Sequence, residues 1–157
     1  MPAITPSLWF DDNLEEALAF YTAIFPNSTI ETVERYTEAG PGTPGAVVSA
    51  SFLLDGQRFI GINGGPQFRF SEAVSFAVNC ADQDEVDYYW ERLVDGGEES
   101  QCGWLADRYG LSWQIVPQRL RELIADPDPA RAAAAATAML GMRKIVIADL
   151  EAAVAGL

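Results

Sequence analysis

Residues 102–117 read CGWLADRYGLSWQIVP, and this stretch predicts a strand, a tight turn and a second strand. Asp107 can accept hydrogen bonds from the backbone of a turn, and Gly110 can take a positive φ, so this segment has the chemistry of a turn. Residues 111–116 are rich in strand-forming side chains, and Pro117 should end the strand. The stretch also combines two Trp, a Tyr, a Cys and a Gln, which makes it the densest group of specific side chains in the chain.

Two stripes of apolar side chains predict two helices at equivalent positions of a repeat. Each stripe has the i, i+3, i+4, i+7 spacing of one helix face, and the second follows the first by 72 residues. One strand pattern precedes each helix, and further short strand patterns follow it. The stripes are Leu14, Ala17, Leu18 and Tyr21 in the first helix, and Val86, Tyr89, Trp90 and Leu93 in the second.

The repeat predicts an α+β fold of two β-α-β-β-β modules, one at about residues 3–65 and one at about 72–117. We expect their sheets to pair around a shared space. The segment 118–157 adds helical patterns, so the chain is expected to be a single domain, 1–157, with a helical tail. This tail either packs on the surface of the domain or serves as a dimer arm.

Local signals mark the starts of the helices and a long loop. Asp12 or Asn13 is expected to cap the first helix, and Glu16 completes a capping box if Asn13 is the cap. Asp82 with Glu85 has the spacing of a second capping box. The Gly- and Pro-rich segment 38–45 is expected to form a plain hairpin connection, and a lid over a site is the alternative.

The composition excludes several classes of function. The net charge is −13 and the pI is near 4.2, so the protein should repel the phosphates of nucleic acids. The absence of histidine excludes histidine-based triads and removes the commonest transition-metal ligand. No apolar run approaches the roughly 20 residues of a membrane span. Because the two cysteines form no disulfide framework and residues 1–5 lack a secretory pattern, we expect a cytoplasmic location.

Six motifs spread over the chain carry a family resemblance. They are Ile4 to Asp11, Phe20-Tyr21, Phe25-Pro26, Glu85 to Trp90, Cys102 to Pro117 and Met139 to Ala148. Together with the two-module pattern, they resemble the vicinal-oxygen-chelate superfamily, also called the glyoxalase/bleomycin-resistance fold, and within it the PhnB-like branch. Relatives often carry the label of ubiquinone methyltransferases. This chain has no Gly-rich strand–loop–helix motif for S-adenosylmethionine, so we do not adopt that label.

The resemblance implies a curved cup of sheet, with outer helices and a cavity on the concave side. Enzymes of the superfamily usually hold a divalent metal there, with one ligand from each of four strands. The equivalent positions here are Thr5, Phe59 or Gly61, Ser75 and Gln114, and metal-binding members have Glu at the last of these. Hydroxyl and amide groups make a poor metal site, so we expect neither a metal nor another cofactor.

Strand alternation gives the side chains that are expected to line the cavity. They are neutral polar and aromatic groups, which suit a small organic ligand held by hydrogen bonds and a ring face. The residues expected to bind this ligand are Thr5, Ser7, Trp9, Phe59, Gly61, Asn63, Ser75 and Gln114, and Ala77, Asn79 and Ser112 are expected on the same faces. Core packing is the alternative role for Trp9, and hydrogen bonding to backbone is the alternative for Gln114.

Five residues have candidate roles that are more simply structural. Cys102 is the one plausible nucleophile, but no histidine is present to activate its thiol. Asp107 could act as a general base, although a solvated residue of the turn is the simpler interpretation. Trp104 and Trp113 are expected to pack between the sheet and the helices, and Cys80 should face the helices.

These observations favour a metal-independent protein that binds a small organic molecule, and sequestration of a toxic compound is one version suggested by the resistance-protein relatives. The alternative is a lyase, isomerase or dioxygenase-like enzyme that uses a weakly held divalent metal or Cys102. A structural subunit of a larger assembly is a third possibility. We expect a homodimer without nucleic-acid or membrane partners.

Overall fold

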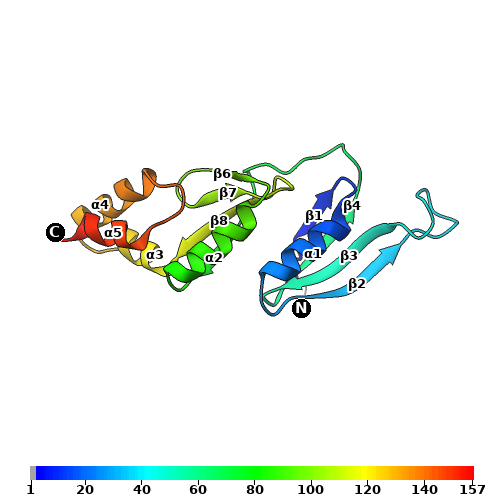
Figure 1. The fold of residues 1–157 in the computed structure, drawn as a ribbon, viewed down its shortest axis with the longest axis horizontal. Helices are drawn as coiled ribbons and strands as arrows, with labels where there is room; N and C mark the ends of the chain where they lie inside the picture. Colours follow the sequence, from blue (N-terminus) through cyan, green and yellow to red (C-terminus); the bar gives the residue numbers. More distant parts are fainter. Residues whose placement is uncertain (1–2) are drawn as a thin grey trace. The chain divides into compact units, whose positions relative to one another are not determined.

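The computed structural model describes residues 3–157. The chain divides into two compact units, residues 1–69 and residues 70–157 (Figure 1). Each unit contains one strand–helix–strand–strand–strand module, so the predicted repeat and the α+β class are confirmed. The joining of the two sheets into one cup stays a prediction. Every helix within residues 3–157 is too short or too polar to cross a bilayer.

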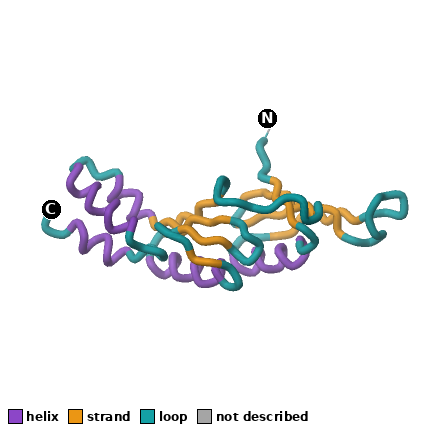
Figure 2. Tube along the Cα trace, turned by 90° about the horizontal axis from the view of Figure 1, so that it is seen from above, coloured by secondary structure: helices purple, strands orange, loops and turns teal. Residues whose placement is uncertain are grey.

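Unit 1 is a four-stranded sheet with one helix on one face (Figures 1 and 2). The sheet has the order β1-β4-β3-β2; β1 runs parallel to β4, and the other neighbours are antiparallel. The stripe predicted for the helix is fully buried against the sheet, which makes this interface the core of the unit. The elements are β1 (Ser7–Phe10), α1 (Leu14–Ile24), β2 (Thr29–Arg35), β3 (Val47–Leu54) and β4 (Gln57–Asn63).

The start of α1 differs from the prediction. Asn13 precedes the helix, but its side chain makes no capping hydrogen bond, so the predicted Asn13–Glu16 capping box is wrong. The Leu14 amide instead donates to Oδ1 of Asn63 at 3.0 Å. The end of β4 therefore satisfies an N–H group that the first turn of a helix leaves without a helical partner.

The segment between β2 and β3 is a hairpin connection, as predicted. The Tyr36 amide donates to the Ala46 carbonyl at 2.9 Å, and the Gly45 amide donates to the Tyr36 carbonyl at 2.9 Å. These bonds continue the ladder beyond the two strands, so the segment closes a hairpin.

Unit 2 repeats this arrangement with the strand order β5-β8-β7-β6 and with β5 parallel to β8. The apolar stripe of its helix packs against the sheet through Val86, Trp90 and Leu93, which are all buried. The elements are β5 (Ser75–Cys80), α2 (Gln83–Val94), β6 (Glu98–Glu99), β7 (Trp104–Ala106) and β8 (Ser112–Pro117).

The predicted capping box of α2 is present. Asp82 Oδ1 accepts a hydrogen bond from the Glu85 amide at 2.9 Å, and Glu85 Oε2 accepts one from the Ala81 amide at 2.7 Å. The two side chains together satisfy donors at the start of the helix and fix the path of the chain after β5.

Asp107 organises the turn between β7 and β8. Its Oδ1 accepts from the amides of Tyr109 at 2.9 Å and Leu111 at 3.1 Å, and its Oδ2 accepts from Trp113 Nε1 at 2.9 Å. Gly110 has a φ of 84° and donates its amide to the Asp107 carbonyl. The turn is as predicted, but the solvated position expected for Asp107 is wrong. Its side chain is buried because the Trp113 indole in the core draws the carboxylate inward.

The helical tail packs on unit 2, which is the surface-packing alternative of the prediction. It contains α3 (Gln118–Ile124), α4 (Pro129–Leu140) and α5 (Ile147–Val154). The amides of Cys102 and Gly103 donate to carbonyls of the segment before α5 at 2.8 and 2.7 Å. A role as dimer arm stays a prediction. The buried side chains of the tail cluster are Leu120, Leu123, Ala135, Ile145, Leu150 and Val154.

The pairing of β1 with β4 places three predicted ligand residues on the helix face of the sheet. Gly61 is the register partner of the buried Leu8, and a Cβ at Gly61 would collide with the Leu14 side chain. Phe59 is buried, and Asn63 bonds to the start of α1. The expectation that these three side chains share a face with Trp9 is therefore wrong. The alternation of side chains along β4 is as predicted, but the alignment of β4 with β1 differs from the prediction by one residue. The side chains of these three residues therefore lie on the opposite face of the sheet from Trp9.

Replacing Asp107 by Asn should lower the free energy of unfolding by about 1–3 kcal/mol, because an amide would place a donor among the three N–H groups that the carboxylate now accepts. Urea unfolding followed by tryptophan fluorescence measures the change. Asp84→Asn, at an exposed position of α2, is the matched control and should have a clearly smaller effect. Equal unfolding midpoints for the two variants would contradict the role of Asp107.

Replacing Gly61 by Ala should also lower the free energy of unfolding, by about 1–3 kcal/mol, because the new methyl group would overpack the interface with Leu14. Gly141→Ala is the control, since the nearest atom to a Cβ there lies 3.6 Å away and its φ is −89°. Thermal unfolding compares the two variants. A Gly61→Ala protein as stable as the control would mean that this position does not face α1.

Candidate functional site

Gln114 and Ser75 form a polar pair on the face of the unit 2 sheet that α2 does not cover. Trp113 and Ile115 flank Gln114 and are buried in the core, so alternation places Gln114 on the opposite face. Gln114 Nε2 donates to Ser75 Oγ at 2.9 Å, and both side chains are half-buried. The Gln114 carbonyl can still accept a hydrogen bond and the Ser75 hydroxyl can still donate one. The structure thus brings two predicted ligand residues together.

Trp104 extends this pair and was missed by sequence reasoning. It is the register partner of Gln114 across β7 and β8, so the two side chains share the helix-free face. Its indole is half-buried, and its N–H has no hydrogen-bond partner among residues 3–157. The expectation that Trp104 packs between sheet and helices is wrong, whereas Trp113 does so. The sequence signal for Trp104 is strand alternation. Counted from Gln114 back across the turn, it places Trp104 on the same face of the sheet.

The other residues on the helix-free face of unit 2 determine how much of that face is accessible. Ala77 and Asn79 are exposed, and Ser112 is buried. Val116, two residues after Gln114, packs against the hydrophobic cluster of the tail. The tail therefore closes one end of the face, and the polar centre at Gln114 stays accessible.

The helix-free face of unit 1 carries the other predicted residues. Trp9 is half-buried, its Nε1 donates to the Gly65 carbonyl at 2.9 Å, and its ring meets Phe68 edge-on with centroids 4.9 Å apart. Trp9 can offer a ligand its ring face but not its N–H group. Ser7 is exposed on the same face, and Thr5 lies before β1, half-buried. The ligand-binding roles of these three residues stay predictions.

The residues at the family's metal positions fit a divalent ion poorly. Thr5, Ser75 and Gln114 offer only hydroxyl and amide oxygens, and Ser75 and Gln114 already bond to each other. Phe59 and Gly61 face α1 and have no side-chain donor. Within residues 3–157, no three Cys, Asp or Glu side chains are grouped to hold a metal ion. We therefore derive no chemistry from a metal at these positions.

Cys102 has a structural role that its sequence position did not reveal. It has a φ of 58°, Gly103 has a φ of 85°, and the Trp104 amide donates to the Gln101 carbonyl at 3.0 Å. These are the features of a tight turn with two left-handed central residues. The Cys102 amide also donates to the Met142 carbonyl in the tail. The backbone of Cys102 therefore has a structural role, because it forms part of the turn and bonds to the tail. A nucleophilic role for the Cys102 thiol stays a prediction.

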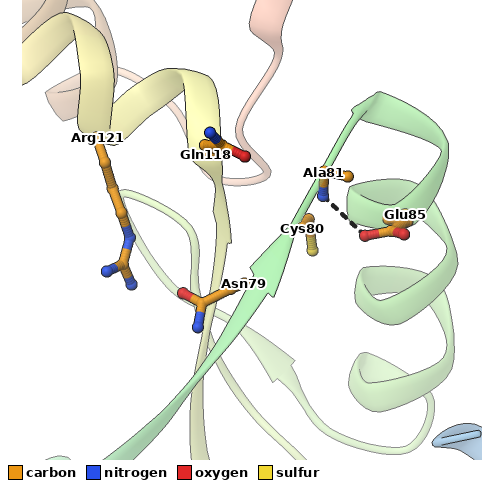
Figure 3. Close-up of a pocket in the computed structure, with 6 residues that line it drawn as sticks. All are labelled: Asn79, Cys80, Ala81, Glu85, Gln118 and Arg121. Atoms are coloured by element: carbon orange, nitrogen blue, oxygen red, sulfur yellow. Dashed lines mark hydrogen bonds between the residues drawn. The ribbon is translucent and has the colours of Figure 1, made fainter.

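A cavity of about 300 Å³ lies elsewhere in unit 2, where the ends of β5 and β8 meet the starts of α2 and α3 (Figure 3). Cys80 contributes to it, and its thiol is buried against α2 as predicted. Burial, reinforced by the negative charges of Glu85 and Asp82, raises the pKa of Cys80 to about 12, so this thiol is protonated at neutral pH. The lining residues are Asn79, Cys80, Ala81, Glu85, Gln118 and Arg121.

Comparisons with known proteins agree with this architecture. A family model described as 3-demethylubiquinone-9 3-methyltransferase matches residues 2–116. A PhnB protein from Bacillus cereus is 37% identical, with a TM-score of 0.68, over 74% of this chain and 99% of that chain. The matched family segment ends before the tail, so the Met139 to Ala148 motif lies outside it. Among curated proteins, none matches.

More distant structures share the fold. Protein PA1353 from Pseudomonas aeruginosa is 18% identical, with a TM-score of 0.63, over 74% of this chain and 98% of that chain. The fosfomycin resistance protein FosX from Listeria monocytogenes is 20% identical, with a TM-score of 0.58, over 80% of this chain and 98% of that chain. These two structures show the shared fold alone. The family-model match and the 37% identity to the Bacillus cereus PhnB protein show that the chain belongs to the PhnB-like branch of the vicinal-oxygen-chelate superfamily.

Proposed function

We propose that this protein binds a small organic molecule on the helix-free face of the unit 2 sheet, through Gln114, Ser75 and Trp104. The observation that carries the proposal is the indole N–H of Trp104, which has no partner among the described residues and lies on the same face as Gln114. The Trp104 Nε1 atom is accessible to solvent, so a ligand or water can accept a hydrogen bond from it. Next to it, the Gln114 carbonyl can accept and the Ser75 hydroxyl can donate.

The chemistry of these groups indicates the class of ligand. The three side chains are uncharged, so they select a neutral or weakly polar compound with at least one acceptor and one donor. The indole also supplies an apolar ring surface against which a planar or cyclic part can pack. Because the protein has a net charge of −13, multiply charged anions are disfavoured at long range.

Methyl transfer is not part of the proposal, although the matched family model is described by that activity. The Rossmann-type sites that bind nucleotide-type cofactors have a Gly-rich turn between a strand and a helix, so that the backbone can approach the cofactor closely. The connections from β1 to α1 and from β5 to α2 contain no glycine. Gly64-Gly65 follows β4, and the next element is a strand.

Sequestration of a toxic compound is one version of the proposed binding. The FosX structures, which are described as those of a fosfomycin resistance protein, support this version only through the shared fold, because their identity to this chain is near 20%. One of them is described as complexed with Mn(II) and sulfate. At the family's metal positions this chain offers only the hydroxyl and amide oxygens of Thr5, Ser75 and Gln114, so we expect binding without the metal.

Native mass spectrometry of the full chain, before and after incubation with manganese, zinc, nickel and iron(II), tests the metal-free part of the proposal. We expect a protein that retains no ion after desalting, because its donor set lacks carboxylates at the family positions. One ion retained per chain would contradict the proposal and would favour a metal-dependent enzyme.

A fragment library of neutral heteroaromatic compounds, screened by NMR against the full chain, tests the ligand-binding part. We expect hits that shift the side-chain signals of Gln114 and Trp104, and whose affinity falls about tenfold in Gln114→Ala and Trp104→Phe, a loss of about 1.4 kcal/mol for each lost hydrogen bond. Gln57→Ala, an exposed glutamine of unit 1, is the control. Hits that bind equally well to all three variants, or the absence of hits, would contradict the proposal.

A further inference from the structure

Residues 142–147, which we call the latch, lead from α4 into α5 and join the tail to the family module of unit 2 (Figure 1). The carbonyls of the first two residues of the latch accept from the amides of Cys102 and Gly103 at 2.8 and 2.7 Å. Cys102 and Gly103 directly precede Trp104 in the chain. The latch therefore bonds to the backbone that carries the proposed ligand-binding indole.

The backbone of this turn has an unfavourable conformation that the latch stabilises. Cys102 has a φ of 58°, a region that is unfavourable for most residues with a β-carbon. The other non-glycine residues with a positive φ within residues 3–157 are Asn27 and Asp55, which are of types that tolerate it. Such a conformation persists only where the surrounding contacts stabilise it. At Cys102, the hydrogen bond to the latch is one of these contacts.

The other end of the latch is fixed to the start of α2 by Gln83. Gln83 Nε2 donates to the Ile145 carbonyl at 3.0 Å, and Gln83 Oε1 accepts from the Ile147 amide at 2.8 Å. Next to these bonds, Lys144 Nζ lies 2.8 Å from Asp87 Oδ1. A single glutamine side chain and one ion pair thus hold the latch on the family module.

The side chain of Ile145 packs the latch against the turn. Ile145 is fully buried, and a Cβ at Gly103 would lie 3.1 Å from its Cγ1 atom. On its other side, the Gly103 carbonyl accepts from the Ile115 amide of β8 at 2.8 Å. The turn is therefore confined between the latch and the sheet. In an interior packed this closely, a displaced latch must also displace the turn.

We propose that the latch regulates ligand binding at the helix-free face of unit 2, because it holds the turn that positions Trp104. This inference rests on the proposed function, since it takes Trp104 as a residue that contacts the ligand. An undocked latch would release the amides of Cys102 and Gly103, and the indole would lose its fixed position beside Gln114. Coupling of this kind is reciprocal, so a ligand bound at Trp104 should also favour the docked tail.

Gln83→Ala tests the proposal without a ligand, in the full chain labelled with ¹⁵N and fluorotryptophan. Hydrogen exchange of the Cys102 and Gly103 amides should accelerate at least about tenfold, because the latch opens more often. The ¹⁹F signal of Trp104 should shift or broaden, whereas that of Trp9 in unit 1 should stay unchanged. Unchanged amide exchange, or an unchanged Trp104 signal, would overturn the proposal whether or not a ligand is known.

Two further variants complete this experiment. Gln118→Ala is the matched control, because Gln118 is also the first residue of a helix and its side chain bonds to Glu122 within α3. It should leave the amide exchange and the Trp104 signal unchanged. Lys144→Met removes the ion pair with Asp87 and keeps Gln83. It should cause the same changes to a smaller extent, and it decides the outcome if Gln83→Ala does not fold.

A hit from the fragment screen tests the coupling itself. Gln83→Ala should weaken binding at least about fivefold in the native background and less than about twofold in Trp104→Phe. The same hit should slow exchange of the Cys102 and Gly103 amides in the native chain. Equal losses in the two backgrounds would mean that the latch does not act through Trp104 and would overturn the proposal. The absence of any hit would contradict the proposed function, whereas the measurements without a ligand would still decide the role of the latch.

Discussion

In each module, the parallel pairing of the first and last strands fixes which side chains the helix can cover. In unit 1 the partners Leu8 and Gly61 both face α1, and in unit 2 the partners Val78 and Ile115 both lie on the α2 side. A shift of one residue in either pair would exchange the two faces of a strand. The polar positions that remain, such as Gln114, are functional candidates because this register keeps them out of the core.

The second constraint is the buried turn at Asp107, which sets the register of β7 against β8. Its carboxylate accepts three hydrogen bonds, one of them from Trp113 in the core. With the turn anchored in this way, Trp104 falls opposite Gln114. The apolar core of unit 2 and its candidate ligand face therefore depend on the same short hairpin, although their side chains point to opposite sides of the sheet.

The sequence was sufficient to predict those features that depend on local periodicity and spacing. The two helical stripes, the Asp107 turn and the α2 capping box follow from the order of residues alone, and they appear in the structure. The phase of β4 against β1 could not be predicted, because it depends on the fit of Gly61 under Leu14. The hydrogen bond at the start of α1 could not be predicted either, because its acceptor, Asn63, lies 49 positions from the donor, Leu14.

The cavity at the end of β5 shows a further limit of prediction from the sequence. Asn79 and Arg121 lie far apart in the chain and have no shared motif, so only the packing of the tail on unit 2 brings them to one cavity. The tail also lies beyond the segment that the family model matches. The face at Gln114 is thus built within the family module, whereas the cavity needs the tail.

A crystal structure of the full chain with its tightest-binding neutral compound tests the central claim most directly. We expect the compound to accept a hydrogen bond from the Trp104 indole and to contact Gln114, with its ring against the indole and no metal between them. A compound bound through a metal ion, or bound only on the helix side of either sheet, would contradict the account.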